Sequence, residues 1–142
     1  MEHAAKVDIK ISISQKIDFY SDGVRMAIIF QNLLSNAIKY HNPRVEKPIV
    51  SVKVIVSEGA CNIAIEDNGV GIKEQYMNQI FNMFFRATND SYGSGLGLYI
   101  TKQVVEKMRG VISVSSSAGL GTMFNIKFPL KKSHTKTVNL DS

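Results

Sequence analysis

The stretch IVSVKVIVSEGACNIAIED, residues 49–67, decides the fold of this chain. Four valines occupy every second position of its first half, and a cysteine and two isoleucines do the same in its second half. A period of two is typical of a strand that buries one face. Glu58-Gly59 lies between the halves and favours a tight turn. The stretch therefore predicts a β-hairpin with strands over residues 49–57 and 61–67.

Upstream of this hairpin, the sequence predicts one strand and one long helix. Apolar residues alternate with polar ones from Val7 to Ser14, which is again the pattern of a half-buried strand. From Val24 to Tyr40 the apolar residues recur at helical spacing, and Asn42-Pro43 ends the helix.

Downstream, the sequence predicts two further helices and a closing hairpin. The helices cover Lys73 to Phe81 and Leu98 to Met108, with a polar, glycine-rich loop between them. The strands of the closing hairpin cover Val111 to Ser116 and Thr122 to Leu130. The order β-α-ββ-α-α-ββ predicts an α/β (α+β) fold, a two-layer sandwich in which a mixed β-sheet is covered on one face by about three helices.

The composition is that of one folded domain. The 142 residues are 44% hydrophobic and 20% charged, and no apolar run reaches the ~18 residues of a membrane span. These values exclude transmembrane and disordered proteins. The single cysteine can form no internal disulfide, and the three histidines are too far apart for a local zinc motif. The N-terminus lacks the apolar segment of a secretory signal, so we expect a cytoplasmic location, with membrane anchoring left open for a longer parent protein.

The charge distribution separates a body from a tail. Seventeen basic and twelve acidic residues leave a net charge of +5, of which three lysines and Asp141 contribute +2 (3 − 1) in residues 131–142. We expect residues 1–130 to form the folded domain and residues 131–142 to be a basic, disordered tail. The mildly basic body is compatible with an anionic ligand, and we expect neither nucleic acid nor a membrane surface as its partner.

Asn32, Asn36 and Lys39 fall at positions i, i+4 and i+7 of the long helix and therefore share one face. A generic polar stripe on a helix is a solvated face. Asparagine, however, is a poor helix former, and its neutral carbonyl oxygen suits a hard cation that phosphates also hold. This composition weakens the solvated interpretation and favours a site for a metal and phosphates.

Asp67 ends the second strand of the hairpin, where the alternation puts its carboxylate on the buried side. A carboxylate in that position needs a hydrogen-bond donor. The residues alone leave two interpretations open. The segment DNGVG, residues 67–71, can be a simple glycine turn. Alternatively, the carboxylate accepts a hydrogen bond from an exocyclic amine such as that of adenine, while Gly69 and Gly71 let the backbone approach a flat ring.

The segment GSGLGL, residues 93–98, directly precedes a helix, so its backbone N–H groups and the helix dipole would meet an anion such as a polyphosphate. Its spacing is neither the dinucleotide fingerprint nor a P-loop, and a flexible linker is the alternative. Just upstream, Arg86 follows three phenylalanines. They can be core residues beside a surface cation, or an aromatic hinge for a nucleotide lid whose Arg86 reaches a phosphate.

Four motifs, in the order in which they follow one another along the chain, resemble those of the catalytic ATP-binding domain of bacterial sensor histidine kinases. The Bergerat fold of that domain is shared with gyrase, a heat-shock chaperone class and mismatch-repair ATPases. NLLSNAIKY at 32–40 resembles the N box, DNGVG at 67–71 the G1 box, IFNMFFR at 80–86 the F box and GSGLGL at 93–98 the G2 box. GLGT at 119–122 resembles a further glycine–threonine turn near the adenine. The resemblance covers roughly residues 19–130 and implies a Bergerat fold with ATP and Mg²⁺ as cofactors.

The resemblance also implies roles for the matched residues. Asn36 would hold Mg²⁺, Lys39 and Arg86 would contact phosphates, and Asp67 would bind the adenine amino group. Asn32 would lie near the phosphates, and the resemblance assigns no catalytic residue within this chain. The nucleotide-binding positions implied in this way are Asn32, Asn36, Lys39, Tyr40, Asp67, Gly69, Gly71, Ile72, Phe84, Arg86, Gly93, Ser94, Gly95, Leu96, Gly97, Leu98 and Thr122.

Within this superfamily, Asn32 favours the kinases. The hydrolytic relatives carry a glutamate there to activate water, and an amide cannot act as a general base. The resemblance then implies an ATP-dependent protein-histidine kinase that transfers the γ-phosphate to a histidine on a separate dimerisation hairpin, with a response regulator downstream. His3 has no helical hairpin around it, so we expect this chain to be a catalytic fragment that is inactive without its phosphoacceptor domain. A serine kinase of the anti-sigma type and a nucleotide-gated interaction module of the same fold are the alternatives.

Overall fold

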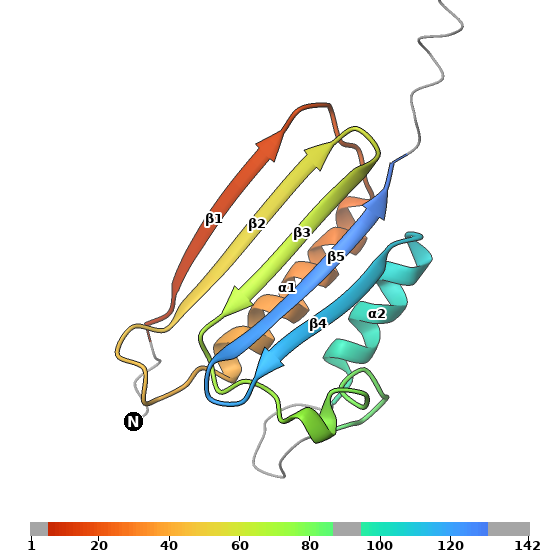
Figure 1. Ribbon diagram of the computed structural model, residues 1–142. Coiled ribbons are helices and arrows are strands. Elements are labelled where there is room, and N and C mark those ends of the chain that lie inside the picture. Colours follow the sequence, from red (N-terminus) through yellow and green to blue (C-terminus); the bar gives the residue numbers. More distant parts are fainter. Residues whose placement is uncertain (1–5, 87–94, 131–142) are drawn as a thin grey trace, which may run out of the picture.

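The computed structural model describes residues 6–86 and 95–130, and a five-stranded sheet forms its centre (Figure 1). The strands lie in the order β1-β2-β3-β5-β4. β1 and β2 are parallel, whereas the other neighbours are antiparallel. Their bounds are β1 Asp8–Gln15, β2 Ile49–Ser57, β3 Ala60–Asp67, β4 Val111–Ser117 and β5 Gly121–Pro129. The predicted mixed sheet and both predicted hairpins are confirmed.

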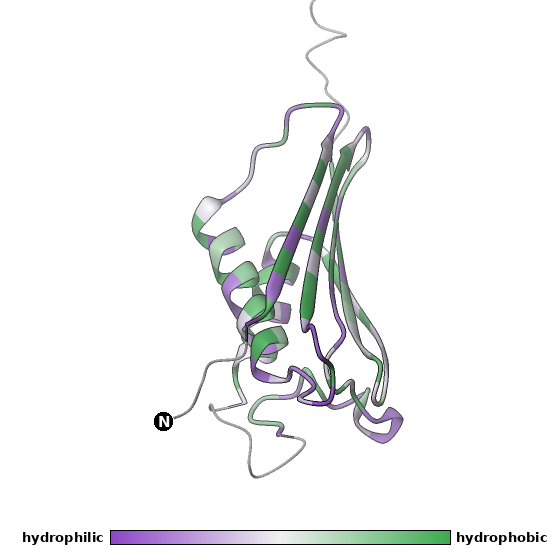
Figure 2. Ribbon diagram, turned by 90° about the vertical axis from the view of Figure 1, so that its left-hand side faces the viewer, coloured by the Kyte–Doolittle hydropathy of each residue, from purple (hydrophilic) through white to green (hydrophobic). Residues whose placement is uncertain are grey.

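Two helices cover one face of the sheet. α1 spans Gly23–Lys39 and α2 spans Gly97–Lys107, and the two helices contact each other. Asp22 caps α1, because its carboxylate accepts a hydrogen bond from the Arg25 N–H at 3.1 Å. Figure 2 shows the two layers edge-on, with both helices on one side of the sheet and polar and apolar residues alternating along the strands. The predicted two-layer α/β sandwich is therefore confirmed.

The core lies between the sheet and the two helices. α1 buries Ile29, Leu33 and Ala37, which repeat every four residues and form one helical face. The sheet contributes the inward positions of the hairpin at 49–67, which are all buried except for the half-buried Val54. Close-packed apolar side chains therefore close the layer between the sheet and the helices.

β1 differs from the prediction of a half-buried strand. Its strand geometry is confirmed, but all eight residues are exposed, with Ile9 45% and both Ile11 and Ile13 66% exposed. The reason is its position at the edge of the sheet, since α1 contacts β2 and β3 and does not extend over β1. The period of two therefore identified the strand but not the layer above it.

The helix predicted over Lys73 to Phe81 is also largely absent. The chain forms a single 3₁₀ turn, η1, over Glu74–Tyr76, followed by further turns. The N–H groups of Gln79 and Asn82 donate to carbonyls three residues earlier, a spacing that tightens the backbone and does not extend into an α-helix. Among the described residues, the sheet is thus covered by two α-helices. None of the helices in the described part of the chain has the length and apolar composition needed to cross a membrane.

Candidate functional site

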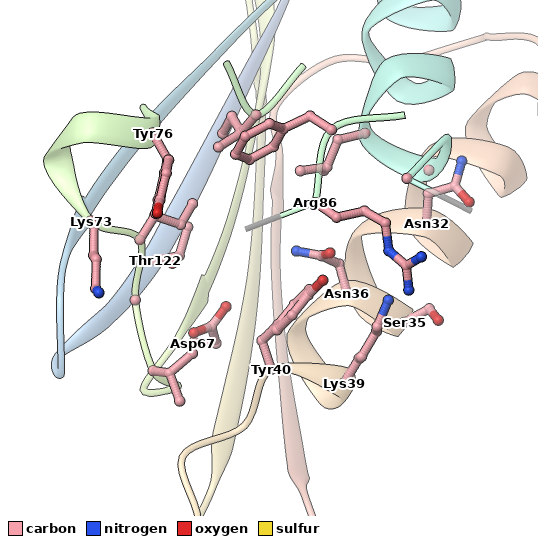
Figure 3. A pocket seen from close by; sticks show the side chains of 18 of the residues that line it. Asn32, Ser35, Asn36, Lys39, Tyr40, Asp67, Lys73, Tyr76, Arg86 and Thr122 are labelled. Atoms are coloured by element: carbon pink, nitrogen blue, oxygen red, sulfur yellow. The ribbon is translucent and has the colours of Figure 1, made fainter. Parts of the chain in front are cut away.

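A cavity of about 570 Å³ lies at the end of β3, between α1 and the start of α2 (Figure 3). The predicted residues that line it are Asn32, Asn36, Lys39, Tyr40, Asp67, Gly71, Ile72, Arg86, Gly95, Gly97, Leu98 and Thr122. They come from segments far apart in the sequence, and the fold brings them around one space. A volume of this size is typical of a site for a small molecule.

Three predicted residues of the described chain do not line the cavity, namely Gly69, Phe84 and Leu96. Phe84 is 62% exposed and adopts a left-handed backbone conformation with φ of 64°. This conformation turns the chain so that the next residue, Phe85, faces the cavity and packs its ring 5.6 Å from that of Tyr76. Phe85 thus occupies the position expected of Phe84. Gly93 and Ser94 lie outside the described residues, as does the predicted tail at 131–142.

The polar stripe of α1 forms one wall of the cavity. Asn32, Asn36 and Lys39 all line it, as the shared helical face predicted, and Ser35 lies among them. Figure 3 shows these side chains projecting from α1, with Asn36 directed into the cavity and Arg86 among the side chains that line it. The ammonium group of Lys39 also lies 5.1 Å from the ring centre of Tyr40, a cation–π distance. This wall therefore combines amide groups with two cations.

Asp67 forms the opposite end of the cavity and is held by backbone donors. One carboxylate oxygen accepts a hydrogen bond from the Gly69 N–H at 2.9 Å, and the Thr122 N–H also donates to the carboxylate. Burial raises the pKa of Asp67 above its usual range, the two backbone hydrogen bonds lower it, and the neighbouring Glu66 raises it further. The carboxylate is thus oriented by the backbone and partly desolvated, so that a donor on a ligand would complete its hydrogen bonds.

The loop after Asp67 is tied to three different elements. The Val70 N–H donates to the Tyr40 carbonyl at the end of α1, at 3.0 Å. The Asn68 amide oxygen accepts from the Ile49 N–H at the start of β2, at 2.8 Å. On the other side, the Val70 carbonyl accepts from the Gly119 N–H at 2.7 Å. These long-range bonds fix the segment as part of the cavity wall, with Asp67, Val70 and Gly71 in the lining, and both interpretations of residues 67–71 remain compatible with that position.

Glycines are required where this loop meets the β4–β5 turn. Gly71 has a φ of 73°, and a Cβ atom there would collide with the Ser117 carbonyl oxygen. A Cβ atom on Gly69 would lie 2.5 Å from the Tyr40 carbonyl oxygen and 2.9 Å from the Asp67 carboxylate. The backbone segments therefore approach each other more closely than any side chain allows.

The start of α2 closes the cavity on the side that carries Lys39 and Arg86. Gly97 is the first residue of α2, one residue before the predicted start, and no side chain caps this end. The Phe84 N–H donates to the Gly95 carbonyl at 3.1 Å, which ties the two described ends of the glycine-rich loop together. Backbone N–H groups at a helix N-terminus together with Arg86 and Lys39 form a favourable environment for an anion.

Several lining residues were not predicted from the sequence, namely Ser35, Val70, Lys73, Tyr76, Ile80, Phe85 and Ala118. Ser35 lies three positions after Asn32, so the helical spacing was a usable signal. Tyr76 and Ile80 were interpreted as the apolar side of a helix that does not form. In the described lining, Asp67 is the one acidic side chain, against the cations of Lys39, Lys73 and Arg86.

The chain is similar in sequence to known sensor proteins. The chain is 33% identical over 117 residues to the sensor protein RprX of Bacteroides fragilis, an alignment that covers 80% of this chain and 22% of that protein. It is likewise 33% identical over 129 residues to a probable C4-dicarboxylate sensor kinase of Bacillus subtilis, covering 90% of this chain and 24% of that protein. The chain thus spans about a quarter of the length of these curated relatives or less.

Solved structures show the same fold. A mycobacterial sensor histidine kinase, MprB, superposes with a TM-score of 0.72 at 29% identity, covering 87% of this chain and 81% of that one. Full-length ShkA, in complex with AMPPNP, gives a TM-score of 0.76 at 24% identity, covering 89% of this chain and 26% of that one. Residues 21–132 match the family described as histidine kinase-, DNA gyrase B- and HSP90-like ATPase. The chain therefore belongs to this ATPase family, as an ATP-binding catalytic domain of the sensor histidine kinase type.

Proposed function

We propose that this domain binds Mg-ATP and presents the γ-phosphate to a histidine on a separate phosphoacceptor domain of a sensor kinase. The observation that carries this proposal is the opposite chemistry of the two ends of the cavity. A desolvated carboxylate, Asp67, lies at the end of β3, whereas Lys39, Arg86 and the start of α2 lie across the cavity. A molecule with an amino-bearing base at one end and a polyphosphate at the other matches both ends.

At the base end, Asp67 accepts a hydrogen bond from the adenine amino group in this proposal. Tyr40, Gly71, Ile72 and Thr122 line the cavity beside it, and Gly69 supplies the N–H that orients the carboxylate. At the phosphate end, Lys39, Arg86 and the backbone of Gly95 and Gly97 bind the phosphate oxygens. Leu98 closes the apolar side of the cavity near this end.

The metal in this proposal is Mg²⁺, held by the amide oxygen of Asn36 together with phosphate oxygens. Within residues 6–86 and 95–130, no three His, Cys, Asp or Glu side chains gather to hold a metal ion by themselves. One neutral protein ligand fits Mg²⁺, which keeps water and takes oxygen ligands from its nucleotide. When bound, the ion would neutralise charge on the β- and γ-phosphates.

Phosphoryl transfer requires an external nucleophile in this proposal. The wall of α1 offers the amides of Asn32 and Asn36, and neither can take a proton from water. Transfer depends on orientation and charge stabilisation, so the γ-phosphate reacts when a second domain brings a histidine to the cavity. We infer that residues 1–130 are the ATP-binding unit, that a response regulator receives the phosphoryl group, and that the domain works in the cytoplasm, where ATP is available.

The test is to incubate the chain with γ-labelled ATP, first alone and then with the phosphoacceptor hairpin of its parent kinase. We expect nucleotide binding without hydrolysis by the chain alone, and label on histidine when the hairpin is added. Rapid ATP hydrolysis by the chain alone, or stable label on a serine of a partner, would contradict the proposal. Binding with no transfer even to the cognate hairpin would instead identify a nucleotide-gated interaction module.

A further inference from the structure

Two hydroxyl groups lie one behind the other at the base end of the cavity. Ser116 on β4 and Thr122 on β5 are paired in the sheet, and their side-chain oxygens are 3.0 Å apart. Thr122 is 8% exposed and lines the cavity beside Asp67, its partner on β3, whereas Ser116 is not part of the lining. Figure 3 shows Thr122 on the wall of the cavity.

Counting protons assigns a direction to this hydrogen bond. The Ser116 hydroxyl carries one proton and lies 2.7 Å from the Gly121 carbonyl oxygen, which can only accept. The Ser116 oxygen also accepts a hydrogen bond from the Ile72 N–H at 2.8 Å. Since the only proton of Ser116 is used on Gly121, the hydrogen bond between the two hydroxyls must come from Thr122. The Thr122 proton therefore points away from the cavity, toward β4.

We propose that Ser116 is a positioning residue for base selection, because it holds the Thr122 hydroxyl in the orientation that offers the cavity only an acceptor. This inference rests on the proposed binding of ATP. Asp67 and Thr122 then present two acceptors side by side at the base end. An amino group has two N–H donors and suits both acceptors, whereas a carbonyl oxygen at the same position of the base faces two acceptors and no donor.

The same serine bonds to the segments next to both acceptors, which lie at the end of β3 and the start of β5. Through the Ile72 N–H, it connects β4 to the loop after Asp67, and through Gly121 it connects to the residue before Thr122. Loss of the Ser116 hydroxyl would leave the Thr122 proton without its partner. Thr122 could then rotate and donate a hydrogen bond into the cavity, which would favour a carbonyl-bearing base.

The experiment measures binding of ATP and inosine triphosphate, which has a carbonyl in place of the amino group, by calorimetry with Mg²⁺ present. For Ser116→Ala we expect the preference for ATP over inosine triphosphate to fall on the order of tenfold. Ser116→Thr keeps a hydroxyl and should retain the preference. Ser115→Ala is the matched control, since Ser115 is an exposed neighbour whose side chain lies on the opposite face of β4.

A second variant separates positioning from general stability. Thr122→Val removes the hydroxyl that Ser116 is proposed to orient and leaves the hydrogen bonds of Ser116 to Ile72 and Gly121 in place. In this background, Ser116→Ala should not change the nucleotide preference further, whatever it does to stability. The inference is overturned if Ser116→Ala leaves the preference intact, or lowers it equally with and without Thr122. If the unchanged chain binds neither nucleotide, the proposed function itself fails.

Discussion

The two ends of the cavity are built in different ways. At the base end, Asp67, Thr122 and Ser116 are held by the sheet and by hydrogen bonds between distant strands and loops. At the phosphate end, Asn32, Asn36 and Lys39 project from one face of a single helix. Under the proposed function, base selection would depend on hydrogen bonds that are already formed between strands and loops, whereas the helical wall would supply side chains that a charged ligand and its metal draw together.

The largest expected effect compares two glycines, one at each end. Gly71→Ala should destabilise the domain by about 3 kcal/mol, because it forces a positive φ on a residue with a Cβ atom and drives that atom into the Ser117 carbonyl. Gly97→Ala should leave stability unchanged or raise it, since its Cβ atom would meet only the Asn32 side-chain oxygen at 3.9 Å, within a helix. Thermal unfolding of both variants measures the difference in stability. Equal losses of stability would contradict the closer backbone packing at the base end.

The second prediction removes the carboxylate at the base end. Asp67→Ala removes the charged acceptor and should weaken ATP binding on the order of 100-fold, because a hydrogen bond to a charged group is lost from a partly buried site. Isothermal titration calorimetry gives the affinity. Asn62→Ala is the control, since Asn62 is an exposed, uncharged residue on the other face of β3. If Asp67→Ala binds ATP as tightly as the unchanged chain does, Asp67 takes no part in base recognition.

The third prediction tests the helical wall. Asn36→Ala should weaken ATP binding on the order of tenfold with Mg²⁺ present, because the amide oxygen proposed to hold the metal is removed. With a chelator in place of Mg²⁺, the variant and the unchanged chain should bind ATP almost equally. Gln31→Ala, an exposed position of α1 outside the lining, serves as the control. A defect that persists without metal would assign Asn36 to direct phosphate contact.

The smallest expected effect is the pH dependence of binding at the base end. Burial raises the pKa of Asp67, so its protonation begins at a higher pH than that of an exposed aspartate. The protonated carboxyl loses its strength as an acceptor, and affinity for ATP should therefore fall as the pH falls through this pKa. Calorimetry from pH 7.5 downward measures the profile for the unchanged chain and for Asp67→Ala. Parallel profiles would show that another group titrates.

The same raised pKa makes the stability of the domain without a ligand depend on pH in the opposite direction. The folded state holds the Asp67 proton more tightly than the unfolded state does, so stability from this group is lost as the pH rises through the raised pKa. Bound nucleotide would offset this cost by donating to the carboxylate. The base end thus retains a group that weakens the empty domain and favours the ligand.

Much of the fold and of the site could be predicted from local pattern. The alternation in residues 49–67 predicted the central hairpin because a strand repeats every two residues, and the polar stripe of α1 followed from helical spacing. These periods are properties of the backbone itself. They identify which side chains share a face, and they are independent of what packs on that face.

The departures from prediction have one physical cause, which is that they depend on contacts between distant segments. β1 shows the same alternation as β2, yet it is exposed because α1 lies over β2 and β3. Residues 73–81 form successive tight turns, and their apolar residues divide between the cavity, which Tyr76 and Ile80 line, and the core, where Phe81 packs against Phe124. Phe84 and Phe85 are chemically identical, and only the left-handed backbone of Phe84 decides which ring faces the cavity.

The sequence by itself determined the strands, the two main helices and twelve of the residues that line the cavity, because backbone periodicity and residue chemistry are local. The tertiary structure alone decided which hydroxyl orients which. The bond between Ile72 and Ser116 spans 44 positions of sequence, and the direction of the bond from Thr122 depends on it and on Gly121. Which of two hydroxyls donates to the other depends on their remaining hydrogen-bond partners, and the packing of the sheet brings those partners together.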